Sequence, residues 1–133
     1  MYPIIYQENK SSCGPACIYM LCEYYHLNYD KKQILFHTRT SNKGTSIWQM
    51  REALHFLGFT SSAAEVISFT SYNLDFPIIA LLMPFKDVYH YVIVYEKKAT
   101  YVLVGDPANG LLYIEINKFI QHFTGMIIIP QFL

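Results

Sequence analysis

The stretch QENKSSCGPACIYMLCEYY, residues Gln7 to Tyr25, predicts the start of a helix with a cysteine at its first position. Ser12 can cap this helix, and Pro15 is tolerated in its first turn because the amide hydrogen that proline lacks would be unpaired there. Apolar residues then follow the spacing i, i+3, i+4, i+7, at Cys17, Met20, Leu21 and Tyr24. We therefore expect a helix from about Cys13 to Tyr25.

Two further helices are expected after this segment. Asp30 is followed three places on by Gln33, and Ser46 by Gln49, and this spacing is the capping-box pattern of a helix start. The second of these helices should stop at Gly58, because glycine readily adopts the left-handed conformation that ends a helix.

The pattern changes to strands in the second half of the chain. Short runs rich in β-branched and aromatic residues are separated by turn residues. They are PIIALLM (77–83), VYHYVIVYE (88–96), TYVLVGD (100–106), LLYIEI (111–116) and GMIIIPQF (125–132). A short helix capped by Asn117 is expected before the last run. Helices followed by an antiparallel sheet predict an α+β fold, which we take as a single domain over residues 1–133.

Composition and charge exclude several classes of function. The 133 residues carry ten basic and ten acidic side chains, so there is no electrostatic case for binding nucleic acid or an anionic membrane. The first ten residues lack a secretory signal, and the apolar runs are shorter than the ~18 residues of a membrane-spanning helix. We expect a soluble cytoplasmic domain.

All three cysteines lie within ten residues of one another, which is not the pattern of a disulfide framework. Cys13 differs from the others because unpaired amides and peptide dipoles at a helix N-terminus favour a thiolate. Gly14 beside it leaves room for a substrate backbone. Cys17 and Cys22 fall inside the helix and are expected to be packing residues. A zinc site on Cys13 and Cys17 is disfavoured by their spacing, and we expect no metal or cofactor.

His90 is the one histidine in the middle of a predicted strand and is our candidate base. If residues 88–96 and 100–106 form a hairpin with a three-residue loop, Glu96 pairs with Thr100 and His90 faces Asp106. The carboxylate would then fix the imidazole tautomer for the thiol. A one-residue slip would place the two side chains on opposite faces.

Gln7 precedes Cys13 by six residues, in the lead-in to the helix. Its side-chain amide can donate to the oxyanion that forms when a thiolate attacks a carbonyl, together with the backbone N–H of Cys13. A surface glutamine is the alternative. Taken together, Gln7, Cys13, His90 and Asp106 suit the four tasks of one acyl-transfer mechanism.

The order and spacing of Q-x5-C-G-P-A-C, G-T-S, H-Y-V-I-V and G-D-P-A-N-G resemble the bacteriocin-processing peptidase domain of peptidase-containing ABC transporters. The resemblance spans Gln7 to about Pro130 and implies a papain-like cysteine peptidase fold. It implies cleavage of a precursor peptide after a Gly-Gly type leader and export by the attached transporter, at the cytoplasmic face of the membrane. Cys13 would be the nucleophile, His90 the base and acid, Asp106 its partner and Gln7 the oxyanion donor.

The resemblance also implies partners and leaves alternatives open. The transmembrane and nucleotide-binding domains of an ABC transporter would be partners, and a leader would bind as an amphipathic helix. Candidates for that surface are Met20, Tyr24 and Tyr25, for which a role in the core is the alternative. Two other functions remain: a domain that binds the leader without cutting it, and a transferase that passes the acyl group to an acceptor other than water.

Overall fold

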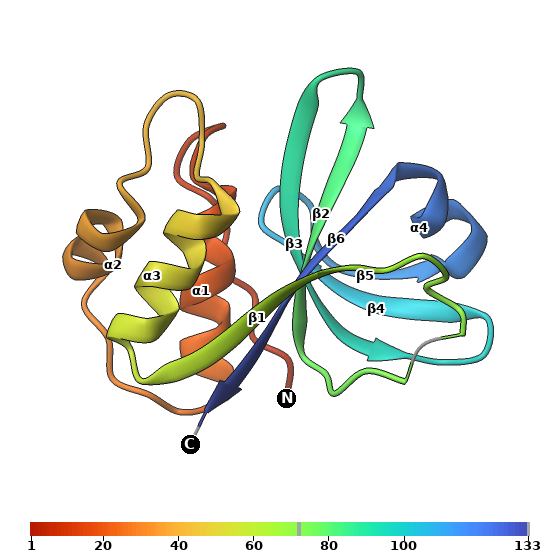
Figure 1. Ribbon diagram of the computed structural model, residues 1–133, viewed down its shortest axis with the longest axis horizontal. Helices are drawn as coiled ribbons and strands as arrows, with labels where there is room; N and C mark the ends of the chain where they lie inside the picture. Colours follow the sequence, from red (N-terminus) through yellow and green to blue (C-terminus); the bar gives the residue numbers. More distant parts are fainter. Residues whose placement is uncertain (72, 133) are drawn as a thin grey trace.

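The computed structural model describes residues 1–71 and 73–132 and shows a helical N-terminal half packed on a sheet (Figure 1). Three helices form that half: α1 (Cys13–Tyr24), α2 (Lys31–Thr38) and α3 (Ile47–Phe56). All three were predicted, and the bounds of α1 differ from the prediction by one residue. None of the helices in the described part of the chain is long and apolar enough to cross a membrane.

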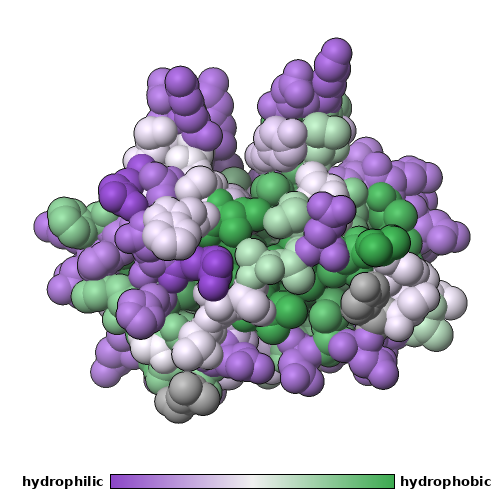
Figure 2. All heavy atoms as spheres, viewed as in Figure 1, coloured by the Kyte–Doolittle hydropathy of each residue, from purple (hydrophilic) through white to green (hydrophobic). Residues whose placement is uncertain are grey.

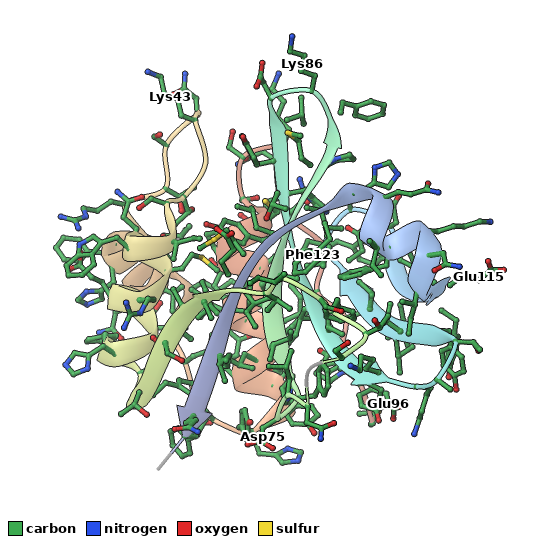
Figure 3. All side chains as sticks on the ribbon, turned by 45° about the vertical axis from the view of Figure 1, so that its right-hand side comes forward. Lys43, Asp75, Lys86, Glu96, Glu115 and Phe123 are labelled. Carbon is green, nitrogen blue, oxygen red and sulfur yellow. The ribbon has the colours of Figure 1, made fainter. Side chains whose placement is uncertain are left out.

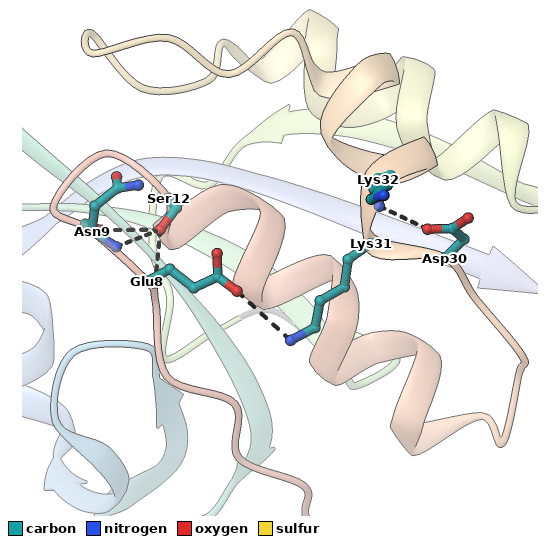
Figure 4. Close-up of polar contacts among 6 residues, drawn as sticks. All are labelled: Glu8, Asn9, Ser12, Asp30, Lys31 and Lys32. Carbon is teal, nitrogen blue, oxygen red and sulfur yellow. Dashed lines mark hydrogen bonds and ion pairs between the residues drawn. The ribbon is translucent and has the colours of Figure 1, made fainter.

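The helix starts follow the predicted capping residues in two of three cases. Ser46 and Gln49 form the complete capping box of α3, and Asp30 accepts from the backbone N–H of Lys32 at the start of α2. Ser12 occupies the cap position of α1 but makes no side-chain cap. Its Oγ instead accepts from the backbone N–H groups of Glu8 and Asn9, at 3.0 Å each (Figure 4). The predicted cap is therefore wrong, since Ser12 stabilises the loop before the helix.

Within the described residues, six strands form one antiparallel sheet in the order β1-β6-β2-β3-β4-β5. Five of them match the predicted runs: β2 (Ile78–Phe85), β3 (Val88–Lys97), β4 (Tyr101–Asp106), β5 (Gly110–Glu115) and β6 (Phe123–Phe132). The sixth, β1 (Phe59–Glu65), was missed because its sequence FTSSAAE carries few β-branched or aromatic residues. It pairs with β6 over its whole length.

The short helix α4 (Ile116–His122) lies between β5 and β6, as predicted, but its start differs from the prediction. Glu115 precedes the helix, and Asn117 lies inside it, so Asn117 is not the cap. The backbone N–H of Ile116 donates to the carbonyl of Thr100, and this bond places the start of the helix against the β3–β4 turn.

Two apolar cores lie on the two faces of the sheet, because alternate residues of each strand point to opposite sides. On β3, Tyr91, Ile93 and Tyr95 belong to the core shared with the helices, whereas Val92 and Val94 belong to the core shared with α4. Helix α1 packs directly against β3. The sheet therefore holds the first turn of α1 beside the strand that carries His90.

Two projections stand out from one side of the molecule (Figure 1). One is the loop between α2 and α3, with Lys43 at its tip, and the other is the β2–β3 hairpin, with Lys86 at its tip (Figure 3). Figure 2 shows both tips as hydrophilic, with a hollow between them.

Candidate active site

Cys13 is the first residue of α1, and its side chain is buried, with 7% of the residue exposed. Its sulfur has three hydrogen-bond partners: the side chain of His90 and the backbone N–H groups of Tyr91 and Gly14. Because Ser12 does not cap the helix, the Gly14 N–H at its start remains available to the sulfur. The local sequence thus makes the helix start an anion site for a thiolate.

The pKa values of Cys13 and His90 shift in opposite directions, that of the thiol downward and that of the imidazole upward. Burial raises the pKa of the Cys13 thiol, but the hydrogen bond with His90, the Tyr91 and Gly14 amides and the charge of His90 together bring it below its ordinary value. Burial lowers the pKa of His90, but hydrogen bonds with Asp106 and Cys13 and their charges raise it from 6.5 to about 9. Both directions favour a thiolate paired with an imidazolium.

Asp106 holds the other side of the imidazole. Its Oδ1 lies 2.6 Å from Nε2 of His90, so the remaining ring nitrogen, Nδ1, is the one available to the thiol. The backbone N–H of Ala108 donates to the same oxygen at 2.8 Å, and Nδ2 of Asn109 donates to Oδ2 at 3.1 Å. Burial raises the pKa of Asp106, but the His90, Ala108 and Asn109 hydrogen bonds lower it overall, so it is charged at neutral pH.

The predicted contact of His90 with Asp106 is present, but the predicted strand register is wrong. Glu96 pairs with Leu103 and not with Thr100, and Ile93 pairs with Gly105, with a register shift between Val94 and Glu96. Continued from Ile93 and Gly105, this register makes Asp106 a diagonal neighbour of His90 on the same face. The contact survives because the shift at this end of the hairpin is two residues, and diagonal neighbours lie within reach of long side chains.

The backbone N–H of Gln7 donates to the carbonyl of Pro107, the residue directly after Asp106, at 2.9 Å. Its Nε2 donates to the carbonyl of Asn9 at 2.9 Å, which leaves its second amide hydrogen for another acceptor. Oε1 is buried and has no hydrogen-bond partner within the described residues. Gln7 lines a cavity with residues 8–12 that shares Ser41 with the cavity beside Cys13. Its role as an oxyanion donor stays a prediction.

A cavity of about 430 Å³ opens beside Cys13, between the two projections. One wall is the loop before α3, from Ser41 to Ser46, with the start of that helix. The facing wall consists of Leu81, Tyr89 and Tyr91 from the β2–β3 hairpin. Cys13 itself lines the cavity.

The remaining cysteines and the proposed leader-binding residues belong to the core. Cys17 and Cys22 are fully buried, and burial raises both thiol pKa values. Met20 is also fully buried, so its assignment to a binding surface is wrong. Tyr24 and Tyr25 are half-buried and pack against rings that include Tyr2, Tyr95, Phe59 and Phe132. The sequence could not separate these roles because all three residues follow the helical spacing of a core face.

Two residues of the site were missed in the sequence. Nδ2 of Asn109 donates to Asp106, and a partial signal was available, since aspartate and asparagine are common in turns, where their side chains make local hydrogen bonds. Tyr91 bonds Cys13 through its backbone, and strand residues carry no sequence signal for such a contact.

A buried thiol at a helix start, an imidazole and a carboxylate thus lie in one hydrogen-bonded chain, an arrangement suited to nucleophilic chemistry by a thiolate. Residues 1–131 match the model of the Peptidase C39 family, and the chain belongs to this family.

Two similar proteins are named for processing together with transport or secretion. The chain is 30% identical to the Lactococcin-G-processing and transport ATP-binding protein LagD of Lactococcus lactis, over 98% of this chain and 19% of LagD. It is 26% identical to the Colicin V secretion/processing ATP-binding protein CvaB of Escherichia coli, over 93% of this chain and 17% of CvaB. The chain thus spans about a fifth of the length of these relatives.

Solved structures share the fold. The peptidase domain of Streptococcus ComA, a bi-functional ABC transporter involved in a quorum sensing pathway, superposes with a TM-score of 0.91 at 25% identity, and the match covers 100% of both chains. A double glycine motif protease from an AMS/PCAT transporter, in complex with a leader peptide, has a TM-score of 0.89 at 23% identity, covering 98% of this chain and 91% of that one. The predicted α+β peptidase fold is confirmed.

Proposed function

We propose that this chain is a cysteine endopeptidase that cuts the leader from a precursor peptide after a Gly-Gly type motif. The observation that carries the proposal is the hydrogen-bonded chain from Cys13 through His90 to Asp106. Membership of the Peptidase C39 family supports the reaction class. The names of LagD, for processing and transport of lactococcin G, and of CvaB, for secretion and processing of colicin V, support the substrate class.

Each residue has one task in the proposed mechanism. The Cys13 thiolate attacks the carbonyl carbon of the scissile bond, and the resulting oxyanion accepts from the Cys13 backbone N–H and the Gln7 side-chain amide. The His90 imidazolium gives its proton to the departing amine, and the acyl group stays on sulfur. His90 then removes a proton from water, which attacks the thioester and releases the leader, while Asp106 holds the ring throughout.

We further propose the setting of this reaction. The partners are the precursor peptide and the transmembrane and nucleotide-binding domains of an ABC transporter, and the location is the cytoplasmic face of the membrane. The lengths of the relatives support this proposal, since the chain matches only 19% of LagD and 17% of CvaB. The double glycine motif protease, which comes from a transporter, was solved in complex with a leader peptide. This complex supports the choice of a leader as substrate.

The direct test is incubation of the protein with a synthetic double-glycine leader peptide joined to a short cargo. Mass spectrometry should find cleavage after the second glycine with wild type and none with Cys13→Ala. Cys17→Ala is the matched control, because it removes a thiol one turn further along the same helix, and it should cleave like wild type. Absence of Cys13-dependent product would reject the proposal.

The same experiment separates the alternatives. A domain that only binds the leader would retain the peptide in both wild type and Cys13→Ala without producing cargo. A transferase would give a product heavier than the free leader when amines are supplied as acceptors.

A further inference from the structure

The loop before α3 is tied to the rest of the molecule by a chain of hydroxyl groups. Thr38, which is fully buried at the end of α2, donates to the carbonyl of Leu35 at 3.2 Å. Its oxygen lies 2.8 Å from Oγ1 of Thr40, which lies 2.6 Å from Oγ1 of Thr45. Since each hydroxyl donates one hydrogen, Thr40 donates to Thr38 and Thr45 donates to Thr40. The Thr45 side chain is therefore hydrogen-bonded, through Thr40, to the end of α2.

The Thr45 backbone is tied to the sheet. Its carbonyl accepts from the hydroxyl of Tyr91 at 2.9 Å. Tyr91 is nearly buried on β3, directly after His90, and its own backbone N–H bonds the Cys13 sulfur. Tyr91 thus contacts the Cys13 sulfur with its main chain and the loop before α3, the opposite wall of the cavity, with its side chain.

The loop also packs directly on the residue after the nucleophile. A β-carbon added at Gly14 would lie 3.2 Å from both Cβ and Oγ1 of Thr45, and 2.9 Å from Sδ of Met50. These distances are shorter than an ordinary van der Waals contact, so Thr45 closes the space above the start of α1. A small shift of Thr45 would therefore change the cavity beside Cys13.

We propose that Tyr91 is a positioning residue, whose hydroxyl fixes the loop from Ser41 to Thr45 as the wall of the substrate cavity and so limits the size of the residues accepted at the cleavage site. This inference rests on the proposed peptidase function. Thr45 is the residue of this wall that is fixed on two sides. Its hydroxyl bonds Thr40 of the threonine chain, and its backbone carbonyl accepts from Tyr91. Loss of either tie would let the wall move without moving the thiol, because the Tyr91 backbone N–H would stay in place.

The chain offers a matched control on the same strand. Tyr95 lies four residues after Tyr91 on β3, and its hydroxyl donates to the carbonyl of Pro3 at 2.6 Å. Both side chains face the core shared with the helices, and both are nearly buried. Tyr95→Phe thus removes a similar hydrogen bond of similar burial from a position that does not line the cavity.

The first experiment measures how readily the loop opens and does not require peptidase activity. Lys43 is exposed at the tip of the loop, so brief trypsin treatment reports opening of the loop by cleavage after Lys43. Loss of one hydrogen bond should raise that cleavage rate about fivefold in Tyr91→Phe and leave it unchanged in Tyr95→Phe. Equal rates in both variants would overturn the inference, even if the wild type proved to have no peptidase activity.

The second experiment measures selectivity with leader peptides that end in Gly-Gly or Gly-Val. In Tyr91→Phe we expect KM for the Gly-Gly peptide to rise about fivefold with kcat nearly unchanged, and preference for Gly-Gly over Gly-Val to fall by a similar factor. Thr40→Val, which cuts the threonine chain, should change selectivity in the same direction. A general loss of stability would slow both peptides equally and would contradict the inference, as would unchanged selectivity in Tyr91→Phe. No cleavage by wild type would instead reject the proposed function.

Discussion

Cys13 and Cys17 lie one turn apart on α1, and both are buried, yet their thiols behave in opposite ways. Burial raises the pKa of Cys17 far above its ordinary value, and the nearby Cys13 and Asp106 charges add to that rise. The pKa of Cys13 is lowered in spite of burial, because three hydrogen bonds and the charge of His90 favour its thiolate.

The difference lies in the groups around each sulfur and not in burial: the hydrogen bond with His90, the Tyr91 amide and the charge of His90 lower the pKa of Cys13 most, and the Gly14 amide at the helix start adds to them. Amides at the start of a helix have no partner inside the helix, whereas those one turn further on are bonded to the preceding turn. Ser12 does not occupy the amides at the start of α1, because its hydroxyl bonds the preceding loop (Figure 4). The helix start and the adjacent strand β3 therefore give Cys13 partners that stabilise its thiolate, which Cys17, four places later, lacks.

The largest effect on this difference should come from His90→Ala. Without the imidazole, Cys13 loses the hydrogen bond and the charge that offset its burial, so its pKa should rise toward that of Cys17. We expect kcat/KM for a double-glycine leader peptide to fall about 10³-fold, since proton transfer to the departing amine is also lost. A variant that kept activity within tenfold of wild type would contradict this assignment.

A smaller effect is expected from Asp106→Asn. The carboxylate raises the pKa of His90 by hydrogen bonding and by charge, and an amide of similar shape keeps only part of that bond. We expect kcat/KM to fall about 10²-fold, with the His90 pKa lowered from about 9 toward 6.5. Histidine titration by NMR measures the shift, and an unchanged pKa would show that Asp106 does not hold the ring. Asn109→Ala, which removes one bond to Asp106, should change both quantities less.

The pH dependence of cleavage follows from the two shifts. The imidazolium loses its proton as the pH rises through about 9, and the thiolate gains one as the pH falls through the lowered pKa of Cys13. Activity should therefore be high between these values and fall on both sides. Because folding raises the pKa of His90, protonation of this residue also adds to the free energy of unfolding. This contribution is fully present below pH 6.5 and is lost as the pH rises through about 9. A rate that only increased up to pH 10 would indicate an ordinary thiol.

The smallest effect should come from Cys17→Ala. The substitution removes one buried sulfur and should lower the free energy of unfolding by about 1 kcal/mol, because it leaves a small cavity. Cleavage of the leader peptide should be unchanged. Thermal unfolding and steady-state kinetics measure the two quantities, and a large loss of activity at unchanged stability would mean that Cys17 belongs to the site.

The sequence predicted the elements of this site better than it predicted their geometry. Cys13 was identified by its place at a predicted helix start, His90 as the one histidine in the middle of a predicted strand, and Asp106 by its place opposite His90 in the predicted hairpin. The register that joins His90 to Asp106 was predicted wrongly, because the register shift near Tyr95 depends on packing and leaves no mark in the sequence.

Other misses have the same origin. Ser12 is a good capping residue by type, but the turn before it offers the hydroxyl better-placed donors. Strand β1 has weak intrinsic preference and exists because β6 provides a long edge to pair with. Met20 has the spacing of either a binding face or a core face, and only the packing of α1 against β3 decides between them.

The central claim is that the start of α1 and His90 together hold Cys13 as a thiolate. It is tested most directly by alkylating the folded protein with iodoacetamide across a range of pH and quantifying each cysteine by mass spectrometry. We predict that Cys13 is alkylated with a pKa below that of an ordinary free thiol, while Cys17 and Cys22 stay unmodified. Alkylation of Cys13 no faster than a model thiol at neutral pH would contradict the claim.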